Sequence, residues 1–282
     1  MKKSVALLLT LACAFSMVAC GAKTEEAPAA TEEAVVEEAV VEETADAETE
    51  ATTDAETAAT AEAEDVKSEG VMTYAEYAAA ELDTEVTVET YVQAKQSWWE
   101  DKATVYTQDK DGAYFLYEMA CSEEDYAKLV PGTKIRVNGY KAEWAGEVEI
   151  VEATFEILEG SFIAEAEDVT AMLASEELVN HQNEFVAFKG MTVEASKDAD
   201  GNDVAFLYNW DGSGEDGNDL YFNVSLDGQT YTFTVESYLC DNTTDVYAAV
   251  KNLQIGDVVD MEGFLYWYEG VNPHITALTV VE

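Results

Sequence analysis

LQIGDVVDMEGFLYWYEG, residues 253–270, decides the fold, because LVPGTKIRVNGYKAEWAG at residues 129–146 is nearly a second copy of it. In each copy a Leu lies three residues before the first of three glycines spaced seven residues apart. The six glycines are Gly132, Gly139, Gly146, Gly256, Gly263 and Gly270. Apolar and polar residues alternate after the first glycine, which is typical of a strand with one buried face. A glycine inside such a strand favours a bulge or sharp bend, so each copy predicts one coiled strand of a small barrel.

The elements expected around the first copy follow the order strand, strand, strand, helix, strand, strand. The strands are expected at 85–94, 103–108, 113–119, 134–144 and 147–158. A turn at 109–112 joins the second and third strands, and Ser122 opens the helix that follows them. A leading helix at 74–82 begins with a capping box of Thr73 and Glu76. This order is that of the OB-fold, a five-stranded Greek-key barrel.

The second copy predicts the same topology. Strands are expected at 184–193, 221–225, 230–238, 258–268 and 274–281, with helices at 167–178 and 243–253. An acidic insertion at 196–219, with a further strand at 204–210, separates the first two strands. We therefore predict a mainly β protein with two tandem OB-fold-like Greek-key barrels, residues 72–160 and 161–282, each with short helices.

Two segments of the first barrel also resemble known OB families. The hairpin VYTQDKDGAYFLY, residues 105–117, resembles the Q-D-x-x-G-x-aromatic hairpin of OB modules in bacterial surface and secreted proteins, some of which are attached to nucleases. The strand at 132–146 is similar to the end of the anticodon-binding OB family. The resemblances imply the fold and leave the function open, since one fold hosts many functions.

The N-terminus predicts export. Lys2 and Lys3 precede an apolar run at 5–18, which has the length of a signal-peptide core and is too short to span a bilayer. The junction MVAC-G that follows resembles the lipobox of bacterial lipoproteins, with Met17 in place of the usual Leu. The resemblance implies that residues 1–19 are removed and that acyl chains on Cys20 hold the protein on the outer face of the bacterial cell membrane. The alternative is an ordinary cleaved signal peptide.

Residues 20–71 predict a disordered acidic linker. Ala, Glu, Thr, Val and Asp make up almost all of the segment, and it contains no aromatic residue. Such a composition buries too little apolar surface to offset the entropy lost on ordering. We expect a self-repelling spacer between the membrane and the barrels.

The charge of the chain bears on its partners. The formal net charge is −45, and Arg136 is its only arginine. Proteins that neutralise phosphates need clustered Lys and Arg. Nucleic acid is therefore expected to be disfavoured, whereas cations, neutral sugars and basic peptides are easier to accommodate.

The candidate binding residues follow from the OB-fold, which binds on the face of its second and third strands between two framing loops. In the first barrel the loops carry Trp98, Trp99 and Trp144, and the strands carry Tyr106 and Tyr117. Aromatic side chains near carboxylates suit sugar rings, flat ligands or peptide side chains. The alternative is that one or more of the tryptophans closes a barrel end.

Two features of the second barrel are also ambiguous. One face of the strand at 258–268 carries three aromatic residues, Phe264, Tyr266 and Tyr268. They form either a second binding strip or a domain interface. Acidic side chains of the insertion could coordinate Ca²⁺, and the candidate ligands are Asp198, Asp200, Asp203, Asp211 and Asp216. Their spacing matches no EF-hand loop, so solvated acidic turns are the alternative. No other cofactor is expected.

Catalysis has little support in the sequence. Cys121 and Cys240 each follow the third strand of their barrel. They are either matching buried residues or a disulfide pair. His181 and His274 are expected to be isolated, and no motif pairs a nucleophile with a base. We predict a non-catalytic cell-surface binding module for a glycan, peptide or other small molecule. A structural component of the cell envelope and an uncharacterised hydrolase are the alternatives.

Overall fold

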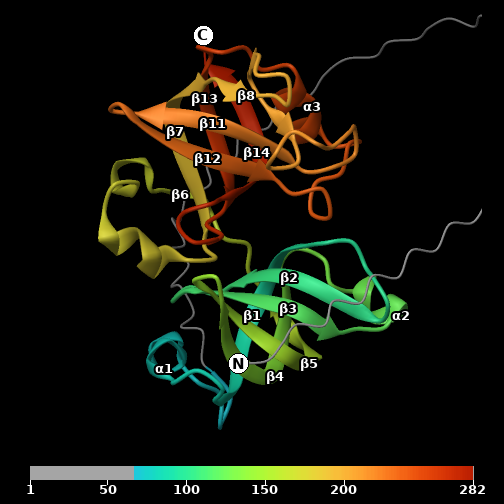
Figure 1. The fold of residues 1–282 in the computed structure, drawn as a ribbon. Helices are drawn as coiled ribbons and strands as arrows, with labels where there is room; N and C mark the ends of the chain where they lie inside the picture. Colours follow the sequence, from blue (N-terminus) through green and yellow to red (C-terminus); the bar gives the residue numbers. More distant parts are fainter. Residues whose placement is uncertain (1–66, 282) are drawn as a thin grey trace, which may run out of the picture. The chain divides into compact units, whose positions relative to one another are not determined.

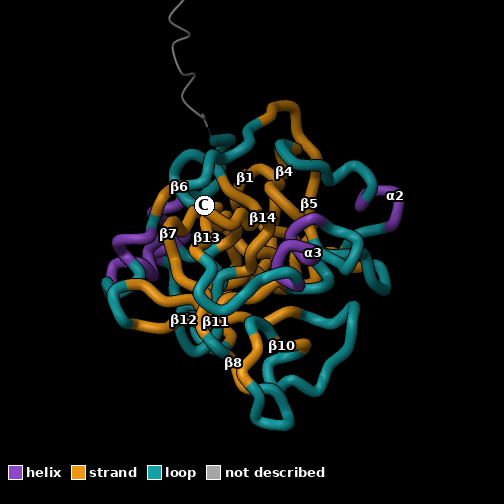
Figure 2. The backbone as a smooth tube through the Cα atoms, turned by 90° about the horizontal axis from the view of Figure 1, so that it is seen from above, coloured by secondary structure: helices purple, strands orange, loops and turns teal. Residues whose placement is uncertain are grey.

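The computed structural model describes residues 67–281, which are mainly strands with a few short helices (Figures 1 and 2). The strands close into two barrels in tandem, so the predicted fold class is confirmed. The predicted signal peptide, Cys20 and nearly all of the predicted linker lie outside the described residues. Within the described range, no helix has the length and apolar composition needed to cross a membrane.

The first barrel consists of five strands in the closed order β1-β2-β3-β5-β4. They are β1 (Glu85–Lys95), β2 (Lys102–Gln108), β3 (Ala113–Ala120), β4 (Thr133–Trp144) and β5 (Glu147–Ser161). Strands β3 and β5 pair in parallel, and the other neighbours are antiparallel. Helix α1 (Tyr74–Ala79) precedes β1, and α2 (Glu123–Tyr126) joins β3 to β4.

The second barrel repeats this topology. Its strands are β7 (Phe185–Glu194), β11 (Leu220–Leu226), β12 (Gln229–Val235), β13 (Val258–Phe264) and β14 (His274–Val281). A pairing of β11 with β7 closes the ring, β12 and β14 pair in parallel, and α3 (Asp245–Lys251) joins β12 to β13. Its equivalence to the first barrel is therefore strand for strand.

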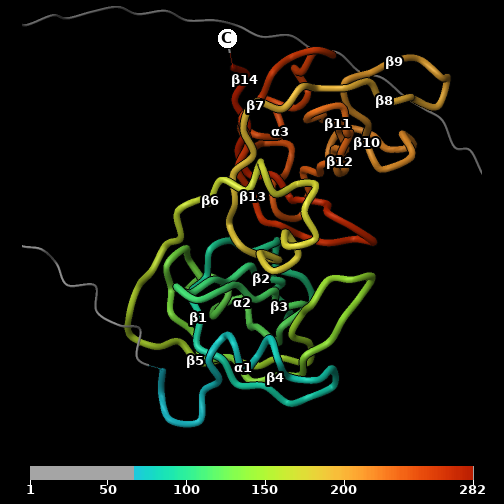
Figure 3. Tube along the Cα trace, turned by 90° about the vertical axis from the view of Figure 1, so that its left-hand side faces the viewer, coloured from blue at the N-terminus to red at the C-terminus, as the bar shows by residue number. Residues whose placement is uncertain are grey.

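The insertion of the second barrel contains only short strands. They are β8 (Ser196–Lys197), β9 (Asp203–Val204) and β10 (Leu207–Tyr208). Strands β8 and β9 form a separate two-stranded sheet, which Figure 3 shows beside the barrel, whereas β10 adds to β11. The single strand predicted at 204–210 is therefore replaced by two short ones.

The prediction of a helix at 167–178 is wrong. These residues form β6 (Glu167–Asp168) and the 3₁₀ helix η1 (Thr170–Met172), and a second 3₁₀ helix, η2 (Glu176–His181), begins before 178. Strand β6 pairs in parallel with β7. The side chain of Ser175 accepts a hydrogen bond from the backbone N–H of Glu177 and so starts η2 as a new helix. Strand pairing and a local cap thus override the helical pattern.

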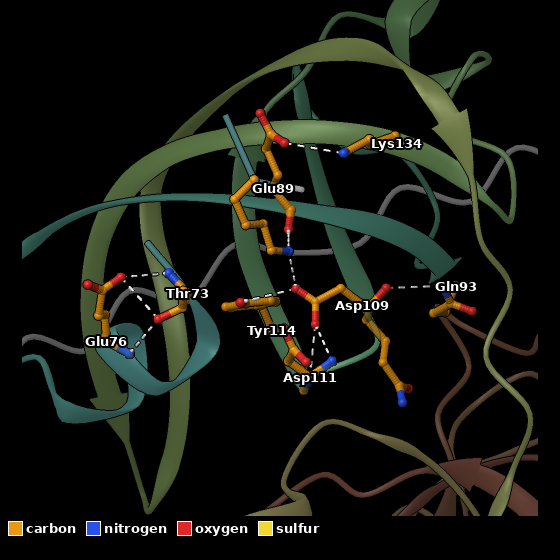
Figure 4. Close-up of polar contacts among 11 residues, drawn as sticks. Thr73, Glu76, Glu89, Gln93, Asp109, Asp111, Tyr114 and Lys134 are labelled. Atoms are coloured by element: carbon orange, nitrogen blue, oxygen red, sulfur yellow. Dashed lines mark hydrogen bonds and ion pairs between the residues drawn. The ribbon is translucent and has the colours of Figure 1, made fainter. Parts of the chain in front are cut away.

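Polar side chains fix the edges of the first barrel as the sequence indicates (Figure 4). Thr73 and Glu76 form the predicted capping box at the start of α1. In the turn between β2 and β3, buried Asp109 accepts hydrogen bonds from the backbone N–H groups of Asp111 and Gly112. Lys67, within the predicted linker, donates to the Asp109 carboxylate at 2.6 Å. The chain is therefore fixed on the barrel slightly before the predicted boundary.

The middle glycine of each repeat lies at a bend, as predicted. The pairing register shifts between Asn138 and Tyr140 around Gly139, and between Glu262 and Gly263. A β-carbon on Gly139 would lie 2.8 Å from the Val151 carbonyl oxygen, and one on Gly263 would overlap the His274 carbonyl oxygen. Strand four of each barrel therefore needs a residue without a side chain where it crosses strand five.

Substitution of Gly263→Ala should lower the free energy of unfolding by about 3 kcal/mol, because the neighbouring backbone leaves no room for a methyl group. Gly256→Ala is a matched control, since Gly256 has a positive φ of 95° but no atom near the position of a β-carbon. Its strain should cost only about 1 kcal/mol. Chemical denaturation compares the two, and equal losses would contradict a steric role for Gly263.

The two barrels meet through a small apolar cluster of their own. Tyr106 and Phe115 of the first barrel pack against Phe264 of the second. The rings of Tyr106 and Phe264 are stacked, with centroids 4.3 Å apart, and the Tyr106 hydroxyl is hydrogen-bonded to Nδ1 of His274 at 2.7 Å. This cluster covers part of the β2–β3 face of the first barrel, where Tyr117 on β3 stays 44% exposed.

Backbone groups of facing loops also join the barrels. The N–H of Ser97 donates to the Tyr238 carbonyl oxygen, and the N–H of Glu269 donates to the Ala145 carbonyl oxygen, both at 2.7 Å. The side chain of Glu147, at the start of β5, accepts from the N–H of Trp267 at 2.9 Å. The junction therefore combines an apolar cluster with hydrogen bonds between the two barrels.

Glu147 is fully buried at this junction, and burial raises the pKa of its carboxyl group to about 8. The pKa of a Glu side chain in the unfolded chain is about 4.3. The stability that the neutral acid contributes is therefore fully present below about pH 4.3. It is lost as the pH rises through 8, when the folded protein must hold a buried charge.

Glu147→Gln should remove this loss, since the amide is neutral at every pH and can still accept from Trp267. Between pH 5 and 8.5 the wild type should lose on the order of 3–5 kcal/mol more than the variant. Denaturant titrations across this range measure the difference, with exposed Glu143→Gln on β4 as the control. Parallel curves for wild type and Glu147→Gln would refute the assignment.

Candidate functional site

A pocket of about 680 Å³ lies where the two barrels meet. Aromatic side chains from both barrels make up much of its wall, and they are Trp144, Trp210, Tyr221, Tyr266 and Tyr268. Trp144 ends β4 of the first barrel, whereas the other four belong to the second. Neither barrel alone contains the whole wall.

The strands of the second barrel form the floor of the pocket. Thr232 and Thr234 on β12 line it, while the alternate residues Phe233 and Val235 point into the core and are fully buried. Tyr221 comes from the neighbouring strand β11. Because β11 and β12 are the second and third strands of this barrel, the pocket lies on the face that OB-folds use for binding.

The aromatic rim of the pocket is accessible. Trp210 is 75% exposed, Trp144 is 54% exposed and Tyr268 is 47% exposed. The rings of Trp144 and Tyr268 lie 5.2 Å apart, and Tyr266 is stacked on His274 at 4.2 Å. Exposed aromatic side chains gathered around a concavity are typical of a binding site.

One ionisable side chain of the pocket is strongly perturbed. Glu236 is only 9% exposed, and its carboxylate accepts hydrogen bonds from the backbone N–H groups of Tyr238 and Leu239. Burial, followed by the charge of Asp219, raises the pKa of Glu236 to about 7. Burial lowers the pKa of His274 to about 3, so this ring is neutral at physiological pH.

The five predicted binding residues do not form one site. Trp144 lies in the pocket described above, whereas Trp99 and Tyr117 line a separate pocket of about 410 Å³. The indole N–H of Trp98 donates to the Cys121 carbonyl oxygen at 2.9 Å, so this side chain is tied to its own barrel. The assignment of Tyr106 needs correction, because the second barrel covers it completely.

Several residues of the pocket were missed by the sequence reasoning. Trp210 belongs to the acidic insertion, and Glu236 follows β12. The equivalence of the two repeats could have pointed to Tyr221 and Thr232, since they occupy strands two and three of the second barrel. The aromatic residues at 264, 266 and 268 were expected to form either a binding strip or a domain interface, and they do both. Phe264 contacts the first barrel, while Tyr266 and Tyr268 line the pocket.

The five candidate calcium ligands are dispersed along the insertion. Asp198 and Asp211 accept hydrogen bonds within their own turns, from Asn202 and Ser213 respectively. The other candidates with described partners are Asp203, paired with Lys197, and Asp216, paired with Lys251. The structure does not bring these carboxylates together, and calcium binding by the insertion stays a prediction.

A different group has the composition of a metal site. Glu167, His181 and Glu184 place one ligand atom each within 4.8 Å of one another. Nδ1 of His181 lies 2.8 Å from Oε2 of Glu184, a contact that no motif in the sequence indicated. Cys121 and Cys240 are buried and free, which supports matching small residues over a disulfide.

The comparisons with known proteins concern the fold. No family model and no curated protein matches the chain. The crystal structure of the tetrameric p202 HIN2 is 12% identical with a TM-score of 0.30, covering 72% of this chain and 96% of that one. A murine DNA-binding protein bound with double-stranded DNA is 8% identical with a TM-score of 0.31, covering 70% and 95%. The Ifi202 HINa domain in complex with a 20-bp double-stranded DNA is 11% identical with a TM-score of 0.31, covering 71% and 96%.

The expectation that nucleic acid is a disfavoured partner of this chain differs from what is bound in these similar structures. Two of the similar structures hold double-stranded DNA. The expectation came from the net charge of −45 and from Arg136 being the only arginine in the sequence.

Proposed function

We propose that this chain is an exported lipoprotein whose two barrels form a non-catalytic binding module for a small organic ligand. The observation that carries the proposal is the pocket at the junction, where Trp144 of the first barrel faces the β11–β12 surface of the second. The ligand is held as a sugar ring or the end of a peptide side chain would be held, between aromatic faces.

The chemistry of the lining supports a ligand with both apolar and polar parts. Aromatic rings offer flat apolar surfaces, and the hydroxyl and amide groups of Thr232, Asn272 and Gln96 offer hydrogen bonds. Thr234 donates to the side-chain oxygen of Asn272 at 2.8 Å, which fixes part of the wall. A volume of about 680 Å³ lies within the range usual for small-molecule sites.

The membrane location is proposed from residues outside the described range. The MVAC-G junction resembles a lipobox, and the acidic residues 20–71 would separate the acylated Cys20 from the barrels. With such an anchor the pocket would lie on the outer side of the membrane, where extracellular molecules could reach it.

Loss of aromatic wall should weaken binding. In a thermal-shift and tryptophan-fluorescence screen of glycans, peptides and small amines, the ligand that stabilises the wild type should bind Trp144→Ala and Trp210→Ala at least about tenfold more weakly, a loss of ~1.4 kcal/mol. Trp99→Ala, a tryptophan of similar exposure in the other pocket, is the matched control. Loss of binding only in Trp99→Ala, or binding by no member of the panel, would disprove this site.

Anchoring can be tested separately. Cys20→Ser should release the protein from the membrane fraction of a bacterial host and abolish incorporation of labelled palmitate. Serine lacks the thiol through which the lipid is attached. Cys13→Ser, within the apolar run before the junction, should leave both unchanged. Retention of Cys20→Ser in the membrane fraction would favour another mode of attachment.

A further inference from the structure

We propose that the junction pocket selects a positively charged alkylammonium group. The inference rests on the proposed function, since it concerns the same pocket, and it adds the chemistry of the ligand. It follows from three features of the pocket: a buried carboxylate, the absence of a basic side chain in the lining, and a wall of aromatic rings.

The carboxylate is that of Glu236. Its two oxygens are held by the N–H groups of Tyr238 and Leu239, so the side chain cannot easily turn away from the pocket. No salt bridge to Glu236 occurs among residues 67–281. Each carboxylate oxygen retains acceptor capacity, and a buried carboxylate is stabilised by a cation more than by any neutral group.

The remaining lining is neutral or aromatic. Gln96, Thr232, Thr234 and Asn272 are uncharged, and the lining includes neither Lys nor Arg. His274 is neutral above about pH 3, because burial lowers the pKa of its ring. A cation entering the pocket therefore meets no like charge, whereas an anion would face Glu236 without compensation.

The aromatic wall favours the same ligand. Trp144, Trp210 and Tyr268 are exposed around the rim, with Tyr221 and Tyr266 deeper in the wall. A cation near the face of an aromatic ring is attracted by the ring quadrupole, most strongly for Trp, and the attraction grows when water is excluded. Aromatic rings and one carboxylate around a cavity are the chemistry that recognises alkylammonium groups.

Protonation of Glu236 links this recognition to pH. Besides burial, the charge of Asp219, which precedes β11, raises the pKa of the Glu236 carboxyl group further. In addition to burial, the charge of Glu236 in turn raises the pKa values of Tyr221 on β11, Cys240 after β12, Tyr266 after β13 and Tyr106 of the first barrel. His274 on β14 lines the same pocket and is neutral. A bound cation favours the carboxylate, so binding near pH 7 releases a proton.

Choline and its isostere 3,3-dimethylbutan-1-ol, tested on the full chain, have the same shape, but choline carries a positive charge and the alcohol is neutral. Calorimetric titration at pH 8 should give choline an affinity at least about tenfold greater than that of the alcohol. Nα-acetyl-lysine amide tests whether a peptide side chain is the source of the ammonium group. Preference for this compound over choline assigns the source to a peptide, and preference for choline assigns it to a free quaternary amine.

The pH profile supplies a second readout that needs no variant. Choline stays charged at every pH, so its affinity should fall about tenfold per unit as the pH drops below 6, when Glu236 holds its proton. Glu236→Gln should abolish this dependence and weaken choline binding at pH 8 without changing that of the alcohol. Glu194→Gln, at the end of β7, is a control outside the pocket lining.

The outcomes separate the two proposals. Equal binding of choline and the alcohol, or a flat pH profile, overturns the selection of a cation. If a neutral glycan nevertheless binds and depends on Trp144 and Trp210, the proposed binding function still holds. If no compound binds in a manner sensitive to these tryptophans, the proposed function itself fails.

Discussion

The contact between Tyr106 and Phe264 is the interaction on which the site depends. Tyr106 occupies the face that a lone OB-like barrel would leave open, and its hydroxyl reaches His274 on the opposite barrel. His274 in turn supports the ring of Tyr266, which lines the pocket. The first barrel thus gives part of its β2–β3 face to the contact and supplies Trp144 to the rim. The pocket is a product of the pairing, and its shape follows from how the aromatic junction is packed.

Much of the fold was accessible from the sequence, because turns and bends leave direct marks on residue type. The seven-residue spacing of glycines locates strand four in both barrels, and the close approach of strand five at Gly139 and Gly263 explains why glycine is required there. The segment at 167–178 was not accessible in this way. Its residues suit a helix, but pairing of β6 with β7 is a long-range contact that local preference does not report.

The site was predicted only in part, for a related reason. Trp144 could be identified because it lies in a framing loop of a recognisable OB-like barrel. Trp210 and Glu236 could not, since they become neighbours only when the insertion and the end of β12 are placed in space. Tyr106 was misassigned because the sequence does not show which barrel faces are covered.

The hydrogen bonds between Ser97 and Tyr238 and between Glu269 and Ala145 join the loops of the two barrels through their backbones. Such bonds need an N–H and a carbonyl but no particular side chain. Residues on the rim of the pocket can therefore be substituted one by one while the backbone hydrogen bonds between the loops are retained. A library that varies positions 144, 210 and 268 would sample new ligand preferences on an unchanged frame, much as antibody loops are varied on a constant sandwich. The paired barrels are in this respect a scaffold for engineered recognition.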